Sequence, residues 1–178
     1  MRQEETLKKI LIAVDGIKDS KEILSLFQNL IWAPENIILL HVEQLEGNVM
    51  MTAMLGDAEM ATLKESLKGT EHKEKLDRKA EQILDYYRKE LENGGLNNIK
   101  TVIKEGHHSD EILKAAEEEN VDLIVMNCSG KTRLHRLVTG CASSEVEKCA
   151  KVPVLITKGD GCGKHAQAWD RREAYAVR

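Results

Sequence analysis

Five short runs of apolar residues are spaced along the first 158 residues of the chain. The first of them is an almost continuous apolar run, which is typical of a strand that is covered on both faces of a sheet. The runs lie at residues 9–14, 37–42, 99–103, 121–126 and 152–157. We therefore expect five strands, of which the first two are buried.

Amphipathic segments separate these runs. Apolar residues recur at helical spacing over 23–31, and a longer apolar stripe precedes Gly94 and Gly95, which are typical of a helix end. The members of the longer stripe are Leu76, Ala80, Ile83, Tyr87 and Leu91. Two further helices are expected, one capped by Ser109 and one that starts near Gly140.

Strands and helices that alternate in this way predict an α/β fold, a doubly wound five-stranded parallel sheet with helices on both faces. We expect the strand order 3-2-1-4-5. Ligands bind such sheets at the carboxyl edge where the strand order reverses, here between the first and fourth strands. That reversal brings Asp15 close to Asn127.

The 178 residues predict one domain over 1–158 and a weakly ordered tail over 159–178. Residues 44–70 form a long Met-rich connection within the domain, and part of it is expected to be helical. It holds Met50, Met51, Met54 and Met60. These side chains either make adaptable contacts with a partner or cover an open face of the core, and the second interpretation is favoured.

Composition and charge narrow the classes of partner. The chain has 30 acidic and 26 basic residues and a net charge of -4, so nothing favours a polyanionic nucleic acid. Its longest apolar runs are too short to span a bilayer and its start lacks a signal-peptide core, which predicts a cytoplasmic protein. The four cysteines, Cys128, Cys141, Cys149 and Cys162, form no C-x2-C pair and are expected to be thiols.

Residues that could bind a phosphate follow the fourth predicted strand. Gly130 and Gly140 bracket a basic loop, and glycines let backbone N–H groups approach a phosphate closely. The helix that follows would direct the positive end of its dipole to the same place. Lys131, Arg133 and Arg136 would add countercharge, although an ordinary solvated loop also carries such residues.

Several segments together resemble the universal stress protein family, whose nucleotide-binding members carry G-x2-G-x9-G followed by Ser or Thr. The resemblance covers nearly the whole domain. Its segments are Val14-Asp15-Gly16, His41-Val42, Glu105-Gly106, Ile124-Val125-Met126 and Val152-Pro153-Val154-Leu155-Ile156. Asn127 stands where the first glycine of the motif belongs, and Cys141 stands where the hydroxyl belongs.

The resemblance implies an adenine nucleotide, ATP or AMP, with no metal unless Mg²⁺ accompanies ATP. It implies that Asp15 binds the ribose hydroxyls, that the backbone at Val42 meets adenine, and that amides near Gly130 and Gly140 hold the phosphates. Asp15 could instead be satisfied by amides of its own turn. The full predicted site is Val14, Asp15, Val42, Met126, Asn127, Gly130, Lys131, Arg133, Gly140, Cys141, Ala142 and Ser143.

The resemblance implies a regulatory stress-response module rather than an enzyme. No nucleophile with a partnering base is recognisable, and the loop does not fit the P-loop pattern G-x4-G-K-[ST]. The resemblance also implies a homodimer, and the predicted edge strand from Val152 to Ile156 would form its interface. The alternative is a homodimer of this type that binds no nucleotide and acts as an interaction module.

Overall fold

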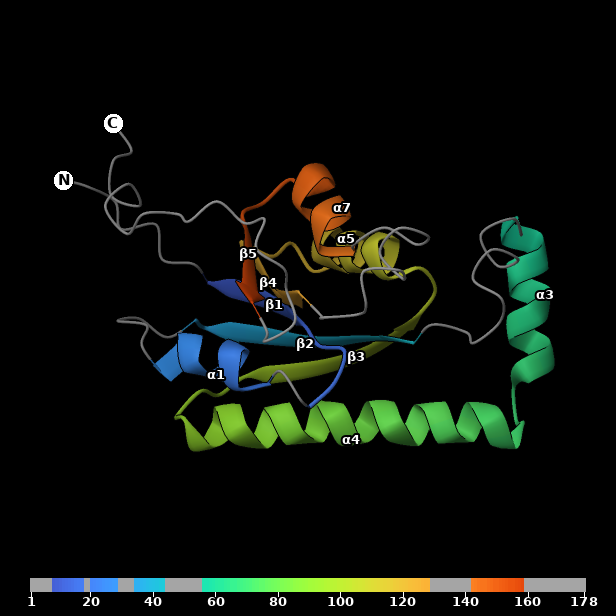
Figure 1. Ribbon diagram of the computed structural model, residues 1–178, viewed down its shortest axis with the longest axis horizontal. Coiled ribbons are helices and arrows are strands. Elements are labelled where there is room, and N and C mark those ends of the chain that lie inside the picture. Colours follow the sequence, from blue (N-terminus) through green and yellow to red (C-terminus); the bar gives the residue numbers. More distant parts are fainter. Residues whose placement is uncertain (1–7, 18–19, 29–33, 44–55, 129–141, 159–178) are drawn as a thin grey trace.

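The computed structural model describes residues 8–17, 20–28, 34–43, 56–128 and 142–158 (Figure 1). Strands and helices alternate along these residues, as the hydrophobic pattern predicts. In chain order the elements are β1 (Lys9–Ala13), α1 (Ser20–Gln28), β2 (Asn36–Glu43), α3 (Asp57–Leu67), α4 (Glu71–Asn93), β3 (Ile99–Glu105), α5 (His108–Glu118), β4 (Leu123–Cys128), α7 (Ala142–Cys149) and β5 (Val154–Lys158).

The five strands form one parallel sheet with the order β3-β2-β1-β4-β5. Helices α1 and α4 cover one face of the sheet, and α5 and α7 cover the other (Figure 1). The predicted doubly wound α/β fold and its strand order are therefore confirmed. The order reverses between β1 and β4, as expected.

The core has two layers, one on each face of the sheet. The layer under α4 contains Ile10, Ile12 and Tyr87, and the layer under α5 and α7 contains Leu11, Ile124 and Val146. Successive residues of β1 face opposite layers because side chains alternate along a strand. Because both faces of β1 are buried, its central residues are all apolar.

The long helix α4 ends at the glycines that the sequence singled out. Gly95 adopts a φ of 85°, a conformation that a glycine enters without steric cost. The amide of Leu96 then donates to the carbonyl of Leu91 at 3.0 Å, which closes the last turn. The chain is thereby directed into β3, the edge strand beside β2.

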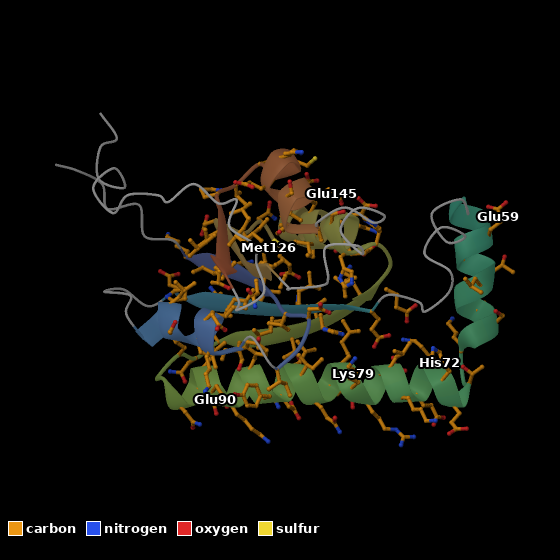
Figure 2. The ribbon with its side chains drawn as sticks, viewed as in Figure 1. Glu59, His72, Lys79, Glu90, Met126 and Glu145 are labelled. Carbon is orange, nitrogen blue, oxygen red and sulfur yellow. The ribbon has the colours of Figure 1, made fainter. Side chains whose placement is uncertain are left out.

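Helix α3 lies within the 44–70 connection, part of which was expected to be helical. It stands apart from the sheet, and Glu59 points away from the sheet (Figures 1 and 2). Most of its described side chains are exposed, so they do not cover the core. The four methionines of this connection lie outside the described side chains.

Other predictions also concern residues that lie outside the described ranges, namely the basic loop at 129–141 and the tail at 159–178. Among the helices that the structure does describe, none combines the length and the apolar character needed to cross a membrane.

Candidate functional site

The carboxyl ends of β1 and β4 lie side by side in the sheet. Ala13, the last residue of β1, pairs with Leu40 of β2 on one side and with Met126 of β4 on the other. The chain that leaves β1 through Val14 and Asp15 therefore starts beside Asn127. Two segments more than 100 residues apart in the sequence meet at the predicted reversal.

Val14 is buried, and both its backbone amide and its backbone carbonyl are hydrogen-bonded. Its amide donates to the carbonyl of Leu40 at 2.9 Å, which extends the pairing with β2 by one residue. Its carbonyl accepts a hydrogen bond from Nδ1 of His41 at 2.8 Å. A carbonyl can only accept, so this contact places a proton on Nδ1 of His41.

Asp15 is exposed at the carboxyl edge, and the next carbonyl along the chain, that of Gly16, is bonded to α4. The hydroxyl of Tyr87 donates to it at 3.0 Å, and Tyr87 is only 1% exposed. The carbonyls of the two residues that flank Asp15 are thus held by side chains from β2 and from α4.

Asn127 occupies the position of the first glycine in the predicted motif. Its amide oxygen accepts a hydrogen bond from the hydroxyl of Thr157 at 3.1 Å. Thr157 belongs to β5, which lies on the far side of β4 from β1. The oxygen of the Asn127 side chain is therefore directed away from the end of β1, where Asp15 lies.

The remaining predicted site residues fall into two groups. Val42, Met126 and Ser143 are buried, Ala142 is half-buried, and helix α7 begins at Ala142. The amides in the first turn of a helix have no partners within that helix, and the positive end of its dipole lies there. Five predicted residues lie outside the described ranges: Gly130, Lys131, Arg133, Gly140 and Cys141.

The first turn of α7 is tied to the start of α5. The hydroxyl of Ser109 donates to the Glu145 carboxylate at 2.7 Å, and Nδ1 of His107 lies 2.9 Å from the same hydroxyl. The prediction that Ser109 caps α5 is wrong, because the N-cap residue is His107 and its side chain makes no capping bond. Ser109 instead joins the two helices on this face.

A cluster of charges lies at the carboxyl ends of β2 and β3. The ammonium of Lys73 on α4 contacts the carboxylates of Glu43 and Asp77, each at 2.5 Å, and that of Glu105 at 2.7 Å. The three carboxylates have the spacing of a metal site, but the ammonium already lies among them. Oε1 of Glu43 is buried and makes no hydrogen bond to any described residue.

The environment of Lys73 favours its charged form. Burial alone would lower the pKa of the ammonium, but its hydrogen bonds to Asp77, Glu105 and Glu43 outweigh burial and raise the pKa above the ordinary value. Lys73 therefore joins α4 to the ends of two adjacent strands as a cation.

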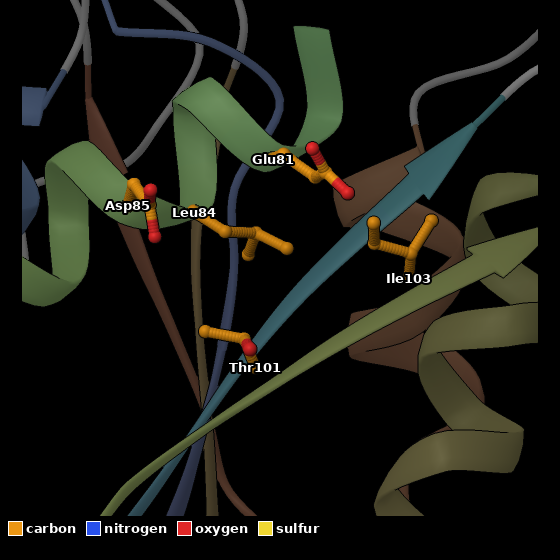
Figure 3. Close-up of a pocket in the computed structure, with 5 residues that line it drawn as sticks. All are labelled: Glu81, Leu84, Asp85, Thr101 and Ile103. Atoms are coloured by element: carbon orange, nitrogen blue, oxygen red, sulfur yellow. The ribbon is translucent and has the colours of Figure 1, made fainter. Parts of the chain in front are cut away.

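A shallow hollow of about 420 Å³ lies between α4 and the edge strand β3. Leu84 and Ile103 face it from the two elements, together with Glu81, Asp85 and Thr101 (Figure 3). None of the predicted site residues lines it. The candidate site at the strand reversal between β1 and β4 is separate from this hollow.

Sequence reasoning assigned no site role to His41 or Tyr87. His41 stood in an apolar run, where a buried imidazole requires a hydrogen-bond partner. Tyr87 stood in the apolar stripe of α4, and a buried tyrosine hydroxyl usually finds a polar partner. The sequence therefore indicates that His41 and Tyr87 are each hydrogen-bonded. Only the fold shows that their partners are the carbonyls on either side of Asp15.

Comparison with known proteins agrees with the geometry of the fold. The model of the universal stress protein family matches residues 6–158. Universal stress protein MJ0577 of Methanocaldococcus jannaschii is 35% identical over 129 residues, which make up 70% of this chain and 77% of that protein. A solved structure of MJ0577 has a TM-score of 0.64 at 30% identity and covers 88% of this chain and 99% of its own.

More distant solved structures share the fold. A universal stress protein in complex with cAMP is 15% identical, with a TM-score of 0.57, and covers 86% of this chain and 98% of its own. A family protein from Arabidopsis thaliana with AMP bound is 18% identical, with a TM-score of 0.55, and covers 86% of this chain and 92% of its own. From the family match and the relative in Methanocaldococcus, we conclude that this chain belongs to the universal stress protein family.

Proposed function

We propose that the chain is a regulatory module that binds an adenine nucleotide, ATP or AMP, at the carboxyl edge between β1 and β4. Asp15 binds the ribose hydroxyls, and the backbone at Val42 contacts adenine. The loop around Gly130 and Gly140 holds the phosphates. Binding stabilises the conformation that the nucleotide prefers, and this linkage turns nucleotide concentration into a signal.

The observation that carries the proposal is the pairing of Ala13 with Met126. This pairing places the exposed Asp15 beside the segment that leads from Asn127 into the glycine loop. The carboxylate proposed to bind the ribose hydroxyls therefore follows the end of β1. The loop whose amides are proposed to bind the phosphates follows the adjacent end of β4. The structures of family proteins with cAMP and AMP support the proposal, because they show adenine nucleotides on this fold.

Calorimetric titration of the full chain, freed of nucleotide, tests the proposal. We expect saturable binding of ATP or AMP below about 1 mM, which corresponds to a binding free energy of at least about 4 kcal/mol in magnitude. Asp15→Asn should weaken binding about 10- to 100-fold, because hydrogen bonds to a charged group contribute about 1.5–3 kcal/mol. The absence of heat and of retained nucleotide at millimolar ATP would reject the proposal.

Asp122→Asn is the matched control for Asp15→Asn. The Asp122 carboxylate accepts hydrogen bonds from the amides of Lys8 and Lys9, each at 2.8 Å, at the opposite end of β1. Its loss should lower stability without changing the nucleotide affinity of the folded protein. Equal losses of affinity in the two variants would show that the Asp15 effect is not local.

A second candidate function is that of an interaction module, a homodimer that binds no nucleotide. It is favoured by Leu155, which is 41% exposed on the edge strand β5. An apolar edge strand is a surface on which a second copy can pair. Sedimentation at micromolar concentrations tests this candidate, which a purely monomeric chain would exclude.

A further inference from the structure

We infer that Tyr87 and His41 are positioning residues that fix the Asp15 carboxylate for a ribose, an inference that rests on the proposed nucleotide site. Tyr87 comes from α4, and His41 comes from β2. Their side chains hold the carbonyls of Gly16 and Val14, the two neighbours of Asp15 in the chain.

The two hydrogen bonds define the path of the turn on either side of Asp15. On one side, both backbone groups of Val14 are bonded. Its amide donates to the Leu40 carbonyl, and its carbonyl accepts from the His41 ring. On the other side, the chain has left the sheet, so no strand pairing holds the Gly16 carbonyl. A glycine backbone has more conformations to lose than any other residue, and a side-chain bond at this point limits them.

The side chains of Tyr87 and His41 are buried, which restricts their conformations. Tyr87 is 1% exposed and His41 is 7% exposed, so neither side chain is free to reorient in water. Tyr87 also packs edge to face against Tyr86, with 5.8 Å between the ring centroids. We expect the backbone turn that these two donors hold to present the Asp15 carboxylate in a preferred orientation. A preferred orientation reduces the entropy that is lost when a ligand binds.

Tyr86 offers a matched control one residue away on the same helix. Its hydroxyl accepts a hydrogen bond from Oγ of Ser20 at 3.3 Å, at the first residue of α1. Tyr86→Phe and Tyr87→Phe each remove one hydroxyl from the same region of the core. Only Tyr87→Phe removes a bond to the turn that carries Asp15.

The test compares ATP with 2′,3′-dideoxy-ATP, which lacks both ribose hydroxyls, as calorimetric ligands of the full chain. We expect Tyr87→Phe to weaken ATP binding about 2- to 10-fold, the effect of one hydrogen bond. The same variant should leave binding of the dideoxy analogue unchanged, and Tyr86→Phe should leave both unchanged. An equal loss for the two ligands, or no loss for ATP, would overturn the inference.

His41 is tested by a conservative replacement. The side-chain amide of asparagine can place an N–H near the position of Nδ1, whereas leucine has no donor. His41→Asn should therefore retain most of the preference for ATP over the dideoxy analogue, and His41→Leu should lose it. Equal preferences in these two variants would show that the donor at this position does not act on the ribose.

Amide hydrogen exchange in the nucleotide-free protein gives a readout that does not depend on binding. Exchange at Gly16 and Ile17 should accelerate in Tyr87→Phe and stay unchanged in Tyr86→Phe. Unchanged exchange in Tyr87→Phe would overturn the inference even if the wild type binds ATP. If the wild type binds no adenine nucleotide but exchange responds as expected, the proposed nucleotide site fails and the hold on the turn stands.

Discussion

Thr157 on β5 donates a hydrogen bond to the side-chain oxygen of Asn127, the residue that replaces the first glycine of the nucleotide motif. The bond directs this oxygen toward the outer strand of the sheet, away from the Asp15 turn. Asn127 is thereby accommodated within the sheet edge. We therefore expect that asparagine at this position does not by itself obstruct the proposed nucleotide site.

Asn127→Gly should accordingly change stability more than nucleotide affinity. It removes the bond to Thr157, which is 7% exposed, and adds glycine entropy, so we expect a loss of about 1–2 kcal/mol in the free energy of unfolding. ATP affinity should change less than about 3-fold. In contrast, Cys141→Ser supplies a stronger hydroxyl donor and should tighten ATP binding up to about 10-fold.

Urea unfolding and calorimetry of the two variants measure these effects separately. If Asn127→Gly tightens ATP binding as much as Cys141→Ser does, the asparagine side chain obstructs the site and the account of its hydrogen bond is wrong.

Lys73→Met should lower the free energy of unfolding by about 3 kcal/mol. It leaves the Glu43 carboxylate, whose side chain is 1% exposed, without its countercharge, and breaking a buried pair from one side is costly. Partial exposure of Asp77 and Glu105 places the expected loss at the low end of the range for buried pairs.

Lys75→Met is the control for Lys73→Met. Lys75 lies on the same helix and pairs with Glu71, but both side chains are largely exposed. Its replacement should cost less than about 1 kcal/mol. Similar losses in urea unfolding for the two variants would contradict a structural role for the buried cluster.

The stabilisation by Lys73 should also depend on pH at the alkaline end. Because the folded protein raises the pKa of Lys73, its contribution is fully present below the ordinary value of 10.5 and is lost as pH rises further. The difference in unfolding free energy between wild type and Lys73→Met should be constant from about pH 7 to 9 and shrink above about pH 10.5. A difference that grows at alkaline pH would contradict this assignment.

Leu155→Lys should shift the chain toward monomer if β5 forms a homodimer interface. A charge in the middle of an apolar edge strand opposes pairing with a second copy. Ile103→Lys is the matched control, since Ile103 is 37% exposed on the other edge strand, β3. Sedimentation velocity distinguishes them, and dissociation by Ile103→Lys alone would move the proposed interface to β3.

The strands and their order could be predicted from the sequence because the three central strands, β1, β2 and β4, are buried on both faces. An unbroken apolar run such as Ile10 to Val14 reflects that burial directly, and the alternation with helices then limits the topology. The approach of Asp15 to Asn127 followed from topology alone, because it depends on strand order and not on any local motif.

The side-chain contacts of the site could not be predicted in the same way. The bond from Tyr87 to Gly16 joins residues 71 positions apart and depends on how α4 lies across the sheet. Lys73 resembled any other surface lysine of an amphipathic helix until the fold placed three carboxylates around it. Ser109 was expected to cap α5, but its tertiary bond to Glu145 took precedence over that local preference.

A nuclear magnetic resonance titration of the full chain with ATP tests the central claim most directly, because it reports each amide separately. The account predicts that the largest shifts occur at Asp15, at Val42 and along residues 127–143, with little change in the hollow lined by Leu84 and Ile103. Shifts confined to that hollow, or no shifts at millimolar ATP, would contradict a nucleotide site at the reversal between β1 and β4.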